Sequence, residues 1–539
     1  LDNVTSIKDW EKAIGREKDY FNNHYKLLQQ QFNQQPLSFK VDRFTQTQTG
    51  KVTFNWSKST HPAKKNITYI LTYGTDFLLQ DSSQTMFTRN LTDTFYTLKG
   101  LLPENTYYWK VTAFDGEFYT DGFNTKNIFE VKKGTQLPEL IKTNLTLTKS
   151  NSPYTTLKTT TIKNGAILTI EAGVEIQLEQ DATIECYGNL IANGTAKQPI
   201  TFMPKNNASE WDYIYFYESS EKAFFNNTIF KDGRLNAKKT NLTLDSCTMS
   251  IDQKFMGNGW DDRKVLIYSG NGNVHIKNST FNGNREGEGI ILFYGEAIVE
   301  NCKLNNVPDA IEYISMNKGI IRNNYVTNSP DDAIDLNNCN NILIENNVLF
   351  NNTDKGISIG TEQYGPSLKN IQINNNLIVG NKSAISIKDS SVAYISNNTL
   401  FKNKYGVRAY KKREDYTKGG TASVLNTIFD KSEYESVSVD EFSEITVANS
   451  VINVKTLKGD NNKTGDPVFI DPERNNFHLS SGSPCVKSGN DKQDIGAFNS
   501  NGTTVSFNKV HLKSSKEKNT GDWIELINNY NIPVDLSLY

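Results

Sequence analysis

Five acidic side chains between residues 309 and 335 have the types and the spacing for acid–base chemistry. Asp309 and Glu312 stand three residues apart, Asp332 and Asp335 repeat that spacing, and Asp331 precedes Asp332. Two carboxyl groups facing one groove can cleave a glycosidic bond, because one protonates the leaving oxygen while another activates water. The same oxygen ligands suit Ca²⁺. The chemistry therefore allows calcium but requires no cofactor, and we assign no metal ligand.

Basic and aromatic residues follow the acids along the chain. Lys355, Lys388 and Arg408 have the charge to neutralise an acidic sugar, and Tyr410 and Tyr364 offer rings for sugar stacking. We predict that these five residues contact a polysaccharide substrate and that the five acids above are its catalytic residues.

A polar repeat extends across this region. An asparagine followed by a short apolar run recurs in steps of 22, 23 or 29 residues, at Asn278, Asn301, Asn323, Asn346, Asn375, Asn397, Asn426 and Asn449. A repeat of about 22 residues cannot bury its apolar side chains alone and must stack on its neighbours. The repeat predicts a parallel β-helix, in which the asparagines form a column whose amides hydrogen-bond along the stack.

Aligning the coils on these asparagines also aligns a second strand, such as Ala333-Ile-Asp-Leu and Gly356-Ile-Ser-Ile. Alternation turns the isoleucines inward and the intervening residues outward. One outward column then contains Asp309, Asp332 and Lys355, and the next contains Glu312, Asp335 and Arg408. The alignment therefore predicts that acids of two adjacent coils share one face, where like charges raise at least one pKa.

Four phrases in this region resemble the site phrases of the polygalacturonases. They are Val307-Pro308-Asp309, Asp331-Asp332, Asp354-Lys355-Gly356 and Ser386-Ile387-Lys388. The resemblance implies a right-handed, pectin-lyase-like solenoid in which Asp309, Asp331 and Asp332 are the acids and Lys388 contacts substrate. Lys355 stands where that family has histidine and Ser386 where it has arginine, which argues against pectin and leaves another glycan.

The ends of the solenoid also have recognisable phrases. "GNLIANGTAKQPITF" and "GDPVFIDPERNNFHLSSGSPCVKSG" resemble the opening and closing segments of secreted bacterial β-helix proteins. This resemblance implies one solenoid over residues 135–500 and a secreted or cell-surface location.

Three further segments flank the solenoid. Residues 1–36 have apolar residues at helical spacing, and residues 37–134 alternate in a way that predicts an antiparallel sandwich. Trp56 and "LLPENTYYWKVTAF" resemble a fibronectin type III domain. Residues 501–539 resemble the start of a lamin tail domain and are too few to close it, so we expect the natural protein to continue. The predicted fold class is all-β with a short N-terminal helix.

Composition excludes several classes of partner. The formal net charge is -2, which predicts no nucleic-acid partner, and no apolar run approaches the roughly 18 residues of a membrane span. The five cysteines and five histidines lack the spacing of disulfides or zinc ligands. The chain begins at Leu1, so we expect a processed or trimmed soluble chain without direct membrane insertion.

The sequence leaves three functions open. The first is a glycoside hydrolase that uses the paired carboxyls. The second is a non-catalytic adhesion or scaffold protein in which the β-helix is a rigid spacer, and the third is a polysaccharide lyase. Whether the chain is an enzyme, and its oligomeric state, are not determined at this level.

Overall fold

The computed structural model describes residues 6–32, 34–42, 44–48, 50–101, 105–123, 128–131, 134–156, 158–205, 211–218, 222–251, 265–361, 369–452, 459–500, 505–511 and 523–528. The chain divides into two compact units. One comprises Leu1–Gln136 with Asn151–Pro153, and the other comprises Leu137–Ser150 with Tyr154–Tyr539. Within these described ranges, no helix has the length and apolarity needed to cross a bilayer.

The first unit begins with helix α1 (Ile7–Phe32). Ser6 caps it, because its hydroxyl accepts a hydrogen bond from the backbone N–H of Asp9 at 3.2 Å and donates one to the Asp9 carboxylate at 2.7 Å. This helix agrees with the amphipathic spacing of the sequence.

Two antiparallel sheets follow and enclose one core. The first contains β1 (Thr45–Gln48), β2 (Lys51–Asn55) and β5 (Phe95–Leu98), and the second contains β4 (Thr85–Leu91), β3 (Thr68–Gly74), β6 (Thr106–Phe114), β7 (Tyr119–Asp121) and β8 (Ile128–Glu130). Phe54 of β2 and Trp109 of β6 pack with ring centroids 4.6 Å apart, which joins the two sheets. Burial alternates along β6 as predicted, and the short strand β9 (Thr135–Gln136) follows β8 along the chain.

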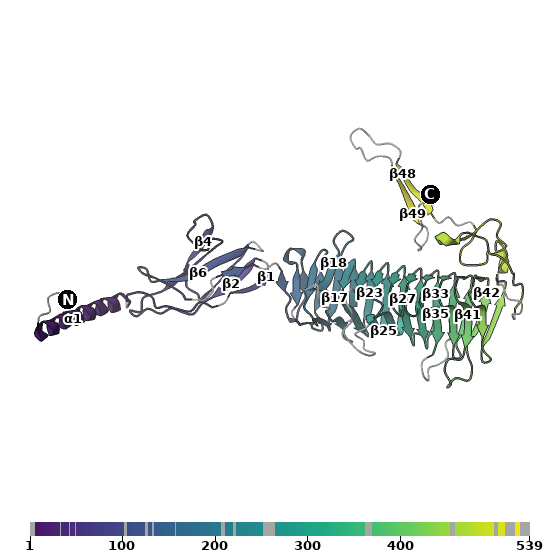
Figure 1. Cartoon of the computed structure of the whole chain (residues 1–539), viewed down its shortest axis with the longest axis horizontal. Helices are drawn as coiled ribbons and strands as arrows, with labels where there is room; N and C mark the ends of the chain where they lie inside the picture. The colour runs from purple at the N-terminus through teal and green to yellow at the C-terminus, as the bar shows by residue number, and fades with distance from the viewer. Residues whose placement is uncertain are drawn as a thin grey trace. The chain divides into compact units, whose positions relative to one another are not determined.

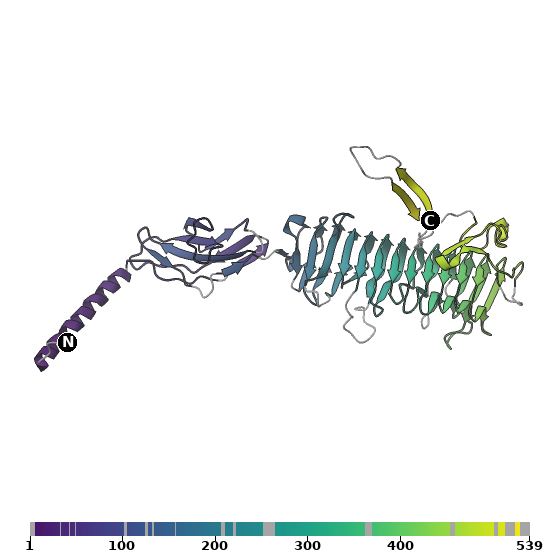
Figure 2. The same ribbon diagram turned by 45° about the horizontal axis from the view of Figure 1, so that its top comes forward.

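The second unit is a parallel β-helix with three strand columns (Figures 1 and 2). We call these columns the first, second and third faces. The first face contains β10 (Leu140–Ile141), β13 (Thr159–Ile162), β16 (Thr183–Cys186), β19 (Tyr213–Phe216), β22 (Arg234–Lys238), the first halves of β25 (Val265–Lys277) and β27 (Glu288–Glu300), β29 (Ile311–Ile314), β32 (Ile334–Asn337), β35 (Lys355–Gly360), β38 (Ser383–Lys388), β41 (Tyr405–Tyr410) and β44 (Glu435–Val439).

The second face continues each coil after a bend. It contains β11 (Leu145–Leu147), β14 (Ile167–Ile170), β17 (Asn189–Asn193), β20 (Lys222–Asn226), β23 (Asn241–Asp245), the second halves of β25 and β27, β30 (Lys318–Arg322), β33 (Asn340–Glu345), β36 (Lys369–Asn374), β39 (Val392–Ser396), β42 (Thr421–Leu425) and β45 (Glu444–Ala448).

The third face completes the coil. It contains β12 (Tyr154–Thr156), β15 (Glu175–Leu178), β18 (Ile200–Pro204), β21 (Thr228–Lys231), β24 (Thr248–Ser250), β26 (Thr280–Asn282), β28 (Lys303–Asn305), β31 (Tyr325–Thr327), β34 (Val348–Phe350), β37 (Leu377–Val379), β40 (Thr399–Phe401) and β43 (Ile428–Asp430). Inward isoleucines, leucines and valines of all three faces form one continuous core. The five cysteines, all among the described residues, are buried and form no disulfide.

The asparagine column differs from the prediction by one residue. The recurring asparagines themselves adopt the left-handed conformation at the bend after the second face, for example Asn323 with φ 55° and Asn346 with φ 54°. The residue that follows each one points inward, and Asn324, Asn347, Asn376 and Asn398 form the hydrogen-bonded ladder with amide contacts of 3.0 Å. In these four coils one asparagine makes the bend and the next one makes the ladder, whereas Ser279, Cys302, Thr427 and Ser450 follow the bend asparagine in the other repeats.

The C-terminal segment covers part of the third face. Phe469 and Phe477, in the hairpin of β46 (Phe469–Asp471) and β47 (Asn476–Leu479), pack against Phe401 of β40, with the Phe401 and Phe477 rings 5.1 Å apart. Short 3-10 turns lie at η1 (Lys149–Asn151), η3 (Pro472–Arg474) and η4 (Asn490–Lys492), and β48 (Val505–His511) pairs with β49 (Trp523–Asn528). A single hairpin does not test the resemblance to a lamin tail domain, which stays a prediction.

Candidate functional site

The acids lie on the first face, in the register that the repeat predicts. Strand pairing aligns Glu312 with Asp335, Asp335 with Ser358, Ser358 with Ser386 and Ser386 with Arg408. Coils of a parallel sheet stand about 4.8 Å apart, so neighbours in this column are in contact distance. The predicted alignment of this column is therefore observed, although Ser358 and Ser386 are fully buried and Glu312 is 9% exposed.

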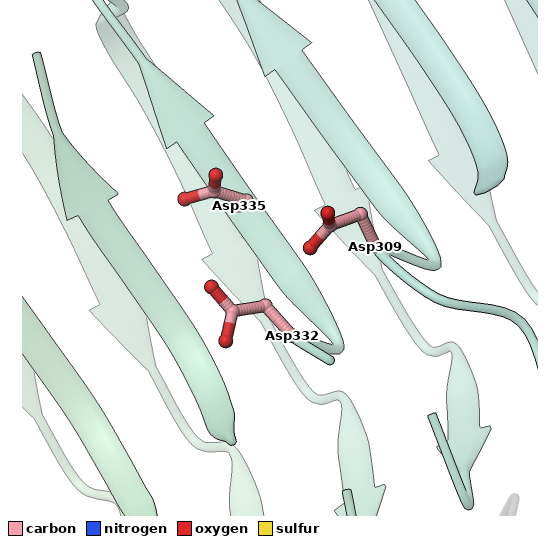
Figure 3. Close-up of side chains that lie close together, drawn as sticks. All are labelled: Asp309, Asp332 and Asp335. Atoms are coloured by element: carbon pink, nitrogen blue, oxygen red, sulfur yellow. The ribbon is translucent and has the colours of Figure 1, made fainter. Parts of the chain in front are cut away.

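Three aspartates meet on this face. Carboxylate oxygens of Asp309, Asp332 and Asp335 all lie within 4.8 Å of one another. Figure 3 shows the three carboxyl groups close together, with Asp309 on the coil before the other two. Asp332 is only 4% exposed. Three acids gathered from two coils, one of them buried, cannot all ionise freely at neutral pH.

The acids therefore have displaced pKa values. Burial, and then the charges of Asp335, Asp332 and Asp331, raise the pKa of Asp309 to about 9. Burial and Asp335 raise the pKa of Asp332 to about 7, although Lys355 opposes this shift. Burial also raises the pKa of Asp331. At neutral pH the Asp309 carboxyl holds a proton, as a general acid must.

A second acidic group adjoins the first through Asp332. Oxygens of Asp331, Asp332 and Asp354 also lie within 4.8 Å of one another. Burial would raise the pKa of Asp354, but its hydrogen bond to Lys355 and the charge of Lys382 lower it below its usual range. Asp354 is not among the predicted site residues, although its position next to the predicted cation Lys355 was a usable signal.

Lys355, which is predicted to contact the substrate, is bound to carboxylates of the protein. Its ammonium group bonds both Asp332 oxygens, at 3.2 and 3.4 Å, and the Asp354 carboxylate. Its backbone N–H also donates to Asp332 Oδ1 at 2.9 Å. Burial would lower the pKa of Lys355, but these carboxylates raise it. Lys355 is therefore a fixed counter-charge that holds Asp332 in place.

Asn337, which is not a predicted site residue either, joins Glu312 to Asp335. Its amide donates to Glu312 Oε1 at 2.8 Å and to Asp335 Oδ2 at 3.0 Å. The other Asp335 oxygen, Oδ1, is buried and has no hydrogen-bond partner among the described residues. Asp335 is thus oriented through one oxygen, while the other keeps unused capacity as a hydrogen-bond acceptor.

The predicted substrate contacts have different environments. Lys388 is only 5% exposed, and its ammonium donates to Ser358 Oγ at 2.8 Å. The Arg408 guanidinium lies over the Tyr405 ring at 4.3 Å and near the Tyr410 ring at 5.2 Å from their centroids. Lys388 is therefore part of the wall of the site, whereas Arg408 and Tyr410 form a half-buried cationic and aromatic surface. Tyr364 lies outside the described residues.

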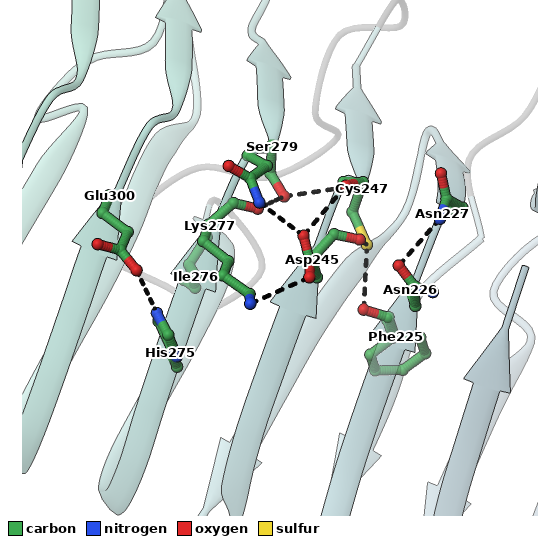
Figure 4. A network of polar contacts seen from close by, with 12 residues as sticks. Phe225, Asn226, Asn227, Asp245, Cys247, His275, Ile276, Lys277, Ser279 and Glu300 are labelled. Atoms are coloured by element: carbon green, nitrogen blue, oxygen red, sulfur yellow. Dashed lines mark hydrogen bonds and ion pairs between the residues drawn. The ribbon is translucent and has the colours of Figure 1, made fainter. Parts of the chain in front are cut away.

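A separate polar network lies on the second face (Figure 4). His275 Nε2 contacts Glu300 at 2.8 Å, and Lys277 pairs with Asp245 at 3.1 Å. A depression of about 300 Å³ adjoins it and is lined by residues that include His275, Glu296, Ile298 and Lys318. Glu296 and Lys318 of this depression pair with each other at 2.9 Å, and its lining residues belong to strands of the second face, apart from the acids of the first face.

The comparisons with known proteins cover parts of the chain. Residues 264–422 match the family model described as a right handed beta helix region. No curated protein matches the chain. The chain is similar to a family 28 exopolygalacturonase of Yersinia enterocolitica, with 11% identity over 80% of this chain and 97% of that chain and a TM-score of 0.28.

Two other solved structures are similar to parts of the chain. A periplasmic alginate epimerase double mutant shares 11% identity over 57% of this chain and 84% of its own, with a TM-score of 0.35. A computationally redesigned β-sandwich protein shares 22% identity over 18% of this chain and 94% of its own, with a TM-score of 0.14. With the strand pairing and the family model, the fold is an all-β chain whose second unit is a right-handed parallel β-helix.

Proposed function

We propose that the first face of the β-helix binds a polysaccharide and hydrolyses it with paired carboxyl groups. The observation that supports this proposal is the meeting of Asp309, Asp332 and Asp335, in which burial and like charge raise the pKa of Asp309 to about 9. A neutral carboxylic acid beside an acceptor carboxylate is the pair that glycosidic cleavage needs.

Each acid has a distinct role in this proposal. Asp309 donates its proton to the glycosidic oxygen, and that bond breaks. Asp335, whose carboxyl group lies beside that of Asp309, takes a proton from a water molecule, whose oxygen bonds to the anomeric carbon. Asp332 holds charge near the reacting sugar, and Lys355 balances it. Glu312 orients Asp335 through Asn337, and Asp331 borders the site on its exposed side.

The cations and rings beyond the acids support an acidic glycan as the ligand. Arg408 presents a guanidinium over Tyr405 and Tyr410 one coil from Ser386. A planar cation over aromatic rings suits a carboxylated or sulfated sugar. We infer a secreted or cell-surface location from this class of ligand.

A glycan panel tests the hydrolase. We expect new reducing ends from at least one acidic polysaccharide, and a loss of about 10²–10⁴-fold in rate for Asp309→Asn, because a general acid contributes that much. Glu296→Gln, on the second face, makes the same acid-to-amide change and should leave the rate unchanged. Equal rates for the parent and Asp309→Asn would overturn the assignment, and unsaturated products would indicate a lyase.

A binding-only scaffold is the second candidate, and one observation favours it. Lys355 and Lys388 are engaged inside the protein, with Asp332 and Ser358 respectively, so two of the predicted cations are not directed at a ligand. If the panel shows binding to a polysaccharide with neither reducing ends nor unsaturated products, the scaffold function replaces the hydrolase.

A further inference from the structure

One outward column of the first face carries an aromatic ring and a cation at equal distances from the acids. From Tyr268 to Asp335 the paired residues are Tyr268, Ile291, Glu312 and Asp335, and from Asp335 to Arg408 they are Asp335, Ser358, Ser386 and Arg408. Each path crosses three coils, or roughly 14 Å at the spacing of a parallel sheet. Asp335 therefore lies midway between Tyr268 and Arg408.

Tyr268 contacts the ring of Phe293 on the next coil. Their ring centroids lie 4.6 Å apart. Gly270 makes room for this contact, because a Cβ atom there would come within 2.1 Å of the Phe293 ring. Two coils farther on, the column of Phe293 reaches Asn337, the residue that orients Asp335. Two adjacent columns of the first face therefore lead from these rings to the acids.

Three tyrosines add rings on the coils before Tyr268. Tyr187 and Tyr217 stack with centroids 4.2 Å apart and an angle of 2° between their planes, and the Tyr215 ring lies 4.3 Å from that of Tyr217. Tyr215 lies in the column of Tyr268, two coils earlier. We call these rings the aromatic series: Tyr187, Tyr215, Tyr217, Tyr268 and Phe293. Each is partly exposed, so the series forms an aromatic surface on the same face as the acids.

The place of the aromatic series beside the acids specifies sugar rings as its ligand. Flat aromatic rings pack against the C–H faces of sugars, and this packing involves no charge. The series and Arg408 lie on opposite sides of the acids, and Tyr268 and Arg408 stand roughly 28 Å apart along their column. No single sugar spans that length, so a ligand that contacts both sides is a glycan chain of several sugars.

We propose that the aromatic series binds the sugars on one side of the cleaved bond and that Arg408 and Tyr410 bind those on the other side. The protein then cuts internal bonds of a long glycan chain, because the end of a chain would leave one of these two surfaces empty. This inference rests on the proposed hydrolase function and adds to it the length and position of the substrate. Stacking on the aromatic series should vary little with salt, whereas binding at Arg408 should weaken as salt screens its charge.

Titration calorimetry of the full chain tests the aromatic series. The panel contains alginate, polygalacturonate, a sulfated galactan and a neutral glucan, and the Asp309→Asn background keeps them intact. Tyr268→Ala should weaken binding of the glycan that the panel selects by about tenfold, at low and at high salt alike. Tyr268→Phe retains the ring and should bind as the background does. Tyr394→Ala removes a tyrosine that is 51% exposed on the second face and should also leave binding unchanged.

These variants separate the failure of this inference from the failure of the proposed function. Equal binding by Tyr268→Ala and Tyr394→Ala would overturn the contact of the aromatic series while leaving the hydrolase intact. Normal binding by a Tyr268→Ala protein that unfolds at a lower temperature would overturn it as well, because the rings would then only stabilise the sheet. A panel in which no glycan binds would overturn both proposals.

The sizes of the first products test internal cleavage by the parent. We expect the viscosity of the glycan solution to fall while few reducing ends have appeared, because long fragments form first. Single sugars released from the start would overturn internal cleavage even if the hydrolase is active. A glycan that binds but is not cleaved would overturn the hydrolase and internal cleavage together, and the titration would still decide whether the aromatic series contacts the glycan.

Discussion

The ammonium group of Lys355 bonds both carboxylate oxygens of Asp332, at 3.2 and 3.4 Å, on adjacent coils of the first face. Both side chains are largely buried, so this ion pair lies in a medium that screens charge weakly. Lys355 therefore opposes the rise in the pKa of Asp332 that burial and the charge of Asp335 cause. The same contact thus stabilises the packing of two coils and lowers the pKa of a candidate catalytic acid.

Removing this cation should cost stability. Lys355→Met leaves Asp332 and Asp354 without their shared partner, and we expect a loss on the order of 2–4 kcal/mol in free energy of unfolding at pH 8. The loss should be smaller at pH 5, where Asp332 takes up a proton. Urea unfolding at both pH values measures it. Lys382→Met, whose side chain is 53% exposed and also pairs with Asp354, should change stability by less than about 1 kcal/mol.

Asp309 should lower the free energy of unfolding at neutral pH, because its raised pKa makes it hold a proton that the unfolded chain releases. Its pKa is about 9 in the folded chain and 3.8 in an unperturbed one. The stabilising contribution of Asp309 to the free energy of unfolding is fully present below pH 3.8, where the group is protonated in both states. This contribution is lost as the pH rises through 9, because the unfolded chain gives up its proton first.

The amide of Asp309→Asn cannot ionise. At pH 8 the free energy of unfolding of this variant should therefore exceed that of the parent by more than about 1 kcal/mol. The two should be equal near pH 4. Thermal unfolding across this range measures the difference. A variant that is less stable than the parent at pH 8 would contradict the raised pKa.

Two adjacent asparagines should respond differently to substitution. Asn347 is fully buried, donates to Ile321 and Asn376, and accepts from Asn324, so Asn347→Ala should cost about 2–3 kcal/mol through unpaired buried groups. Asn346 has φ 54°, a conformation that glycine adopts readily, so Asn346→Gly should be nearly neutral. Comparable losses in chemical denaturation would show that the bend and the ladder are not separate roles.

Arg408 should select acidic glycans. Arg408→Gln removes the cation but keeps a polar side chain over Tyr405 and Tyr410, so we expect about tenfold weaker binding of a carboxylated polysaccharide at low salt. Binding of a neutral glycan should not change. Isothermal titration with both ligands checks this, and equal weakening of the two would mean that Arg408 acts by packing alone.

Much of the fold follows from the sequence, because in a solenoid the repeat period and the alternation of side chains along each strand place the residues. The asparagine spacing superposes the coils, and alternation then assigns residues to columns. The pairing of Glu312 with Asp335 confirms this register. The same rule could not say which of two adjacent asparagines points inward, because the left-handed bend at Asn323 and Asn346 shifts the ladder to the next residue.

The sequence by itself determined the β-helix, its register and the face on which the acids gather, since these depend only on period and alternation. Only the tertiary structure decided how those acids behave. Three features depend on side-chain directions and on desolvation. Asp332 is buried, Lys355 pairs with Asp332 and Asp354, and Asn337 donates to both Glu312 and Asp335. A pKa is set by those surroundings and not by the order of residues along the chain.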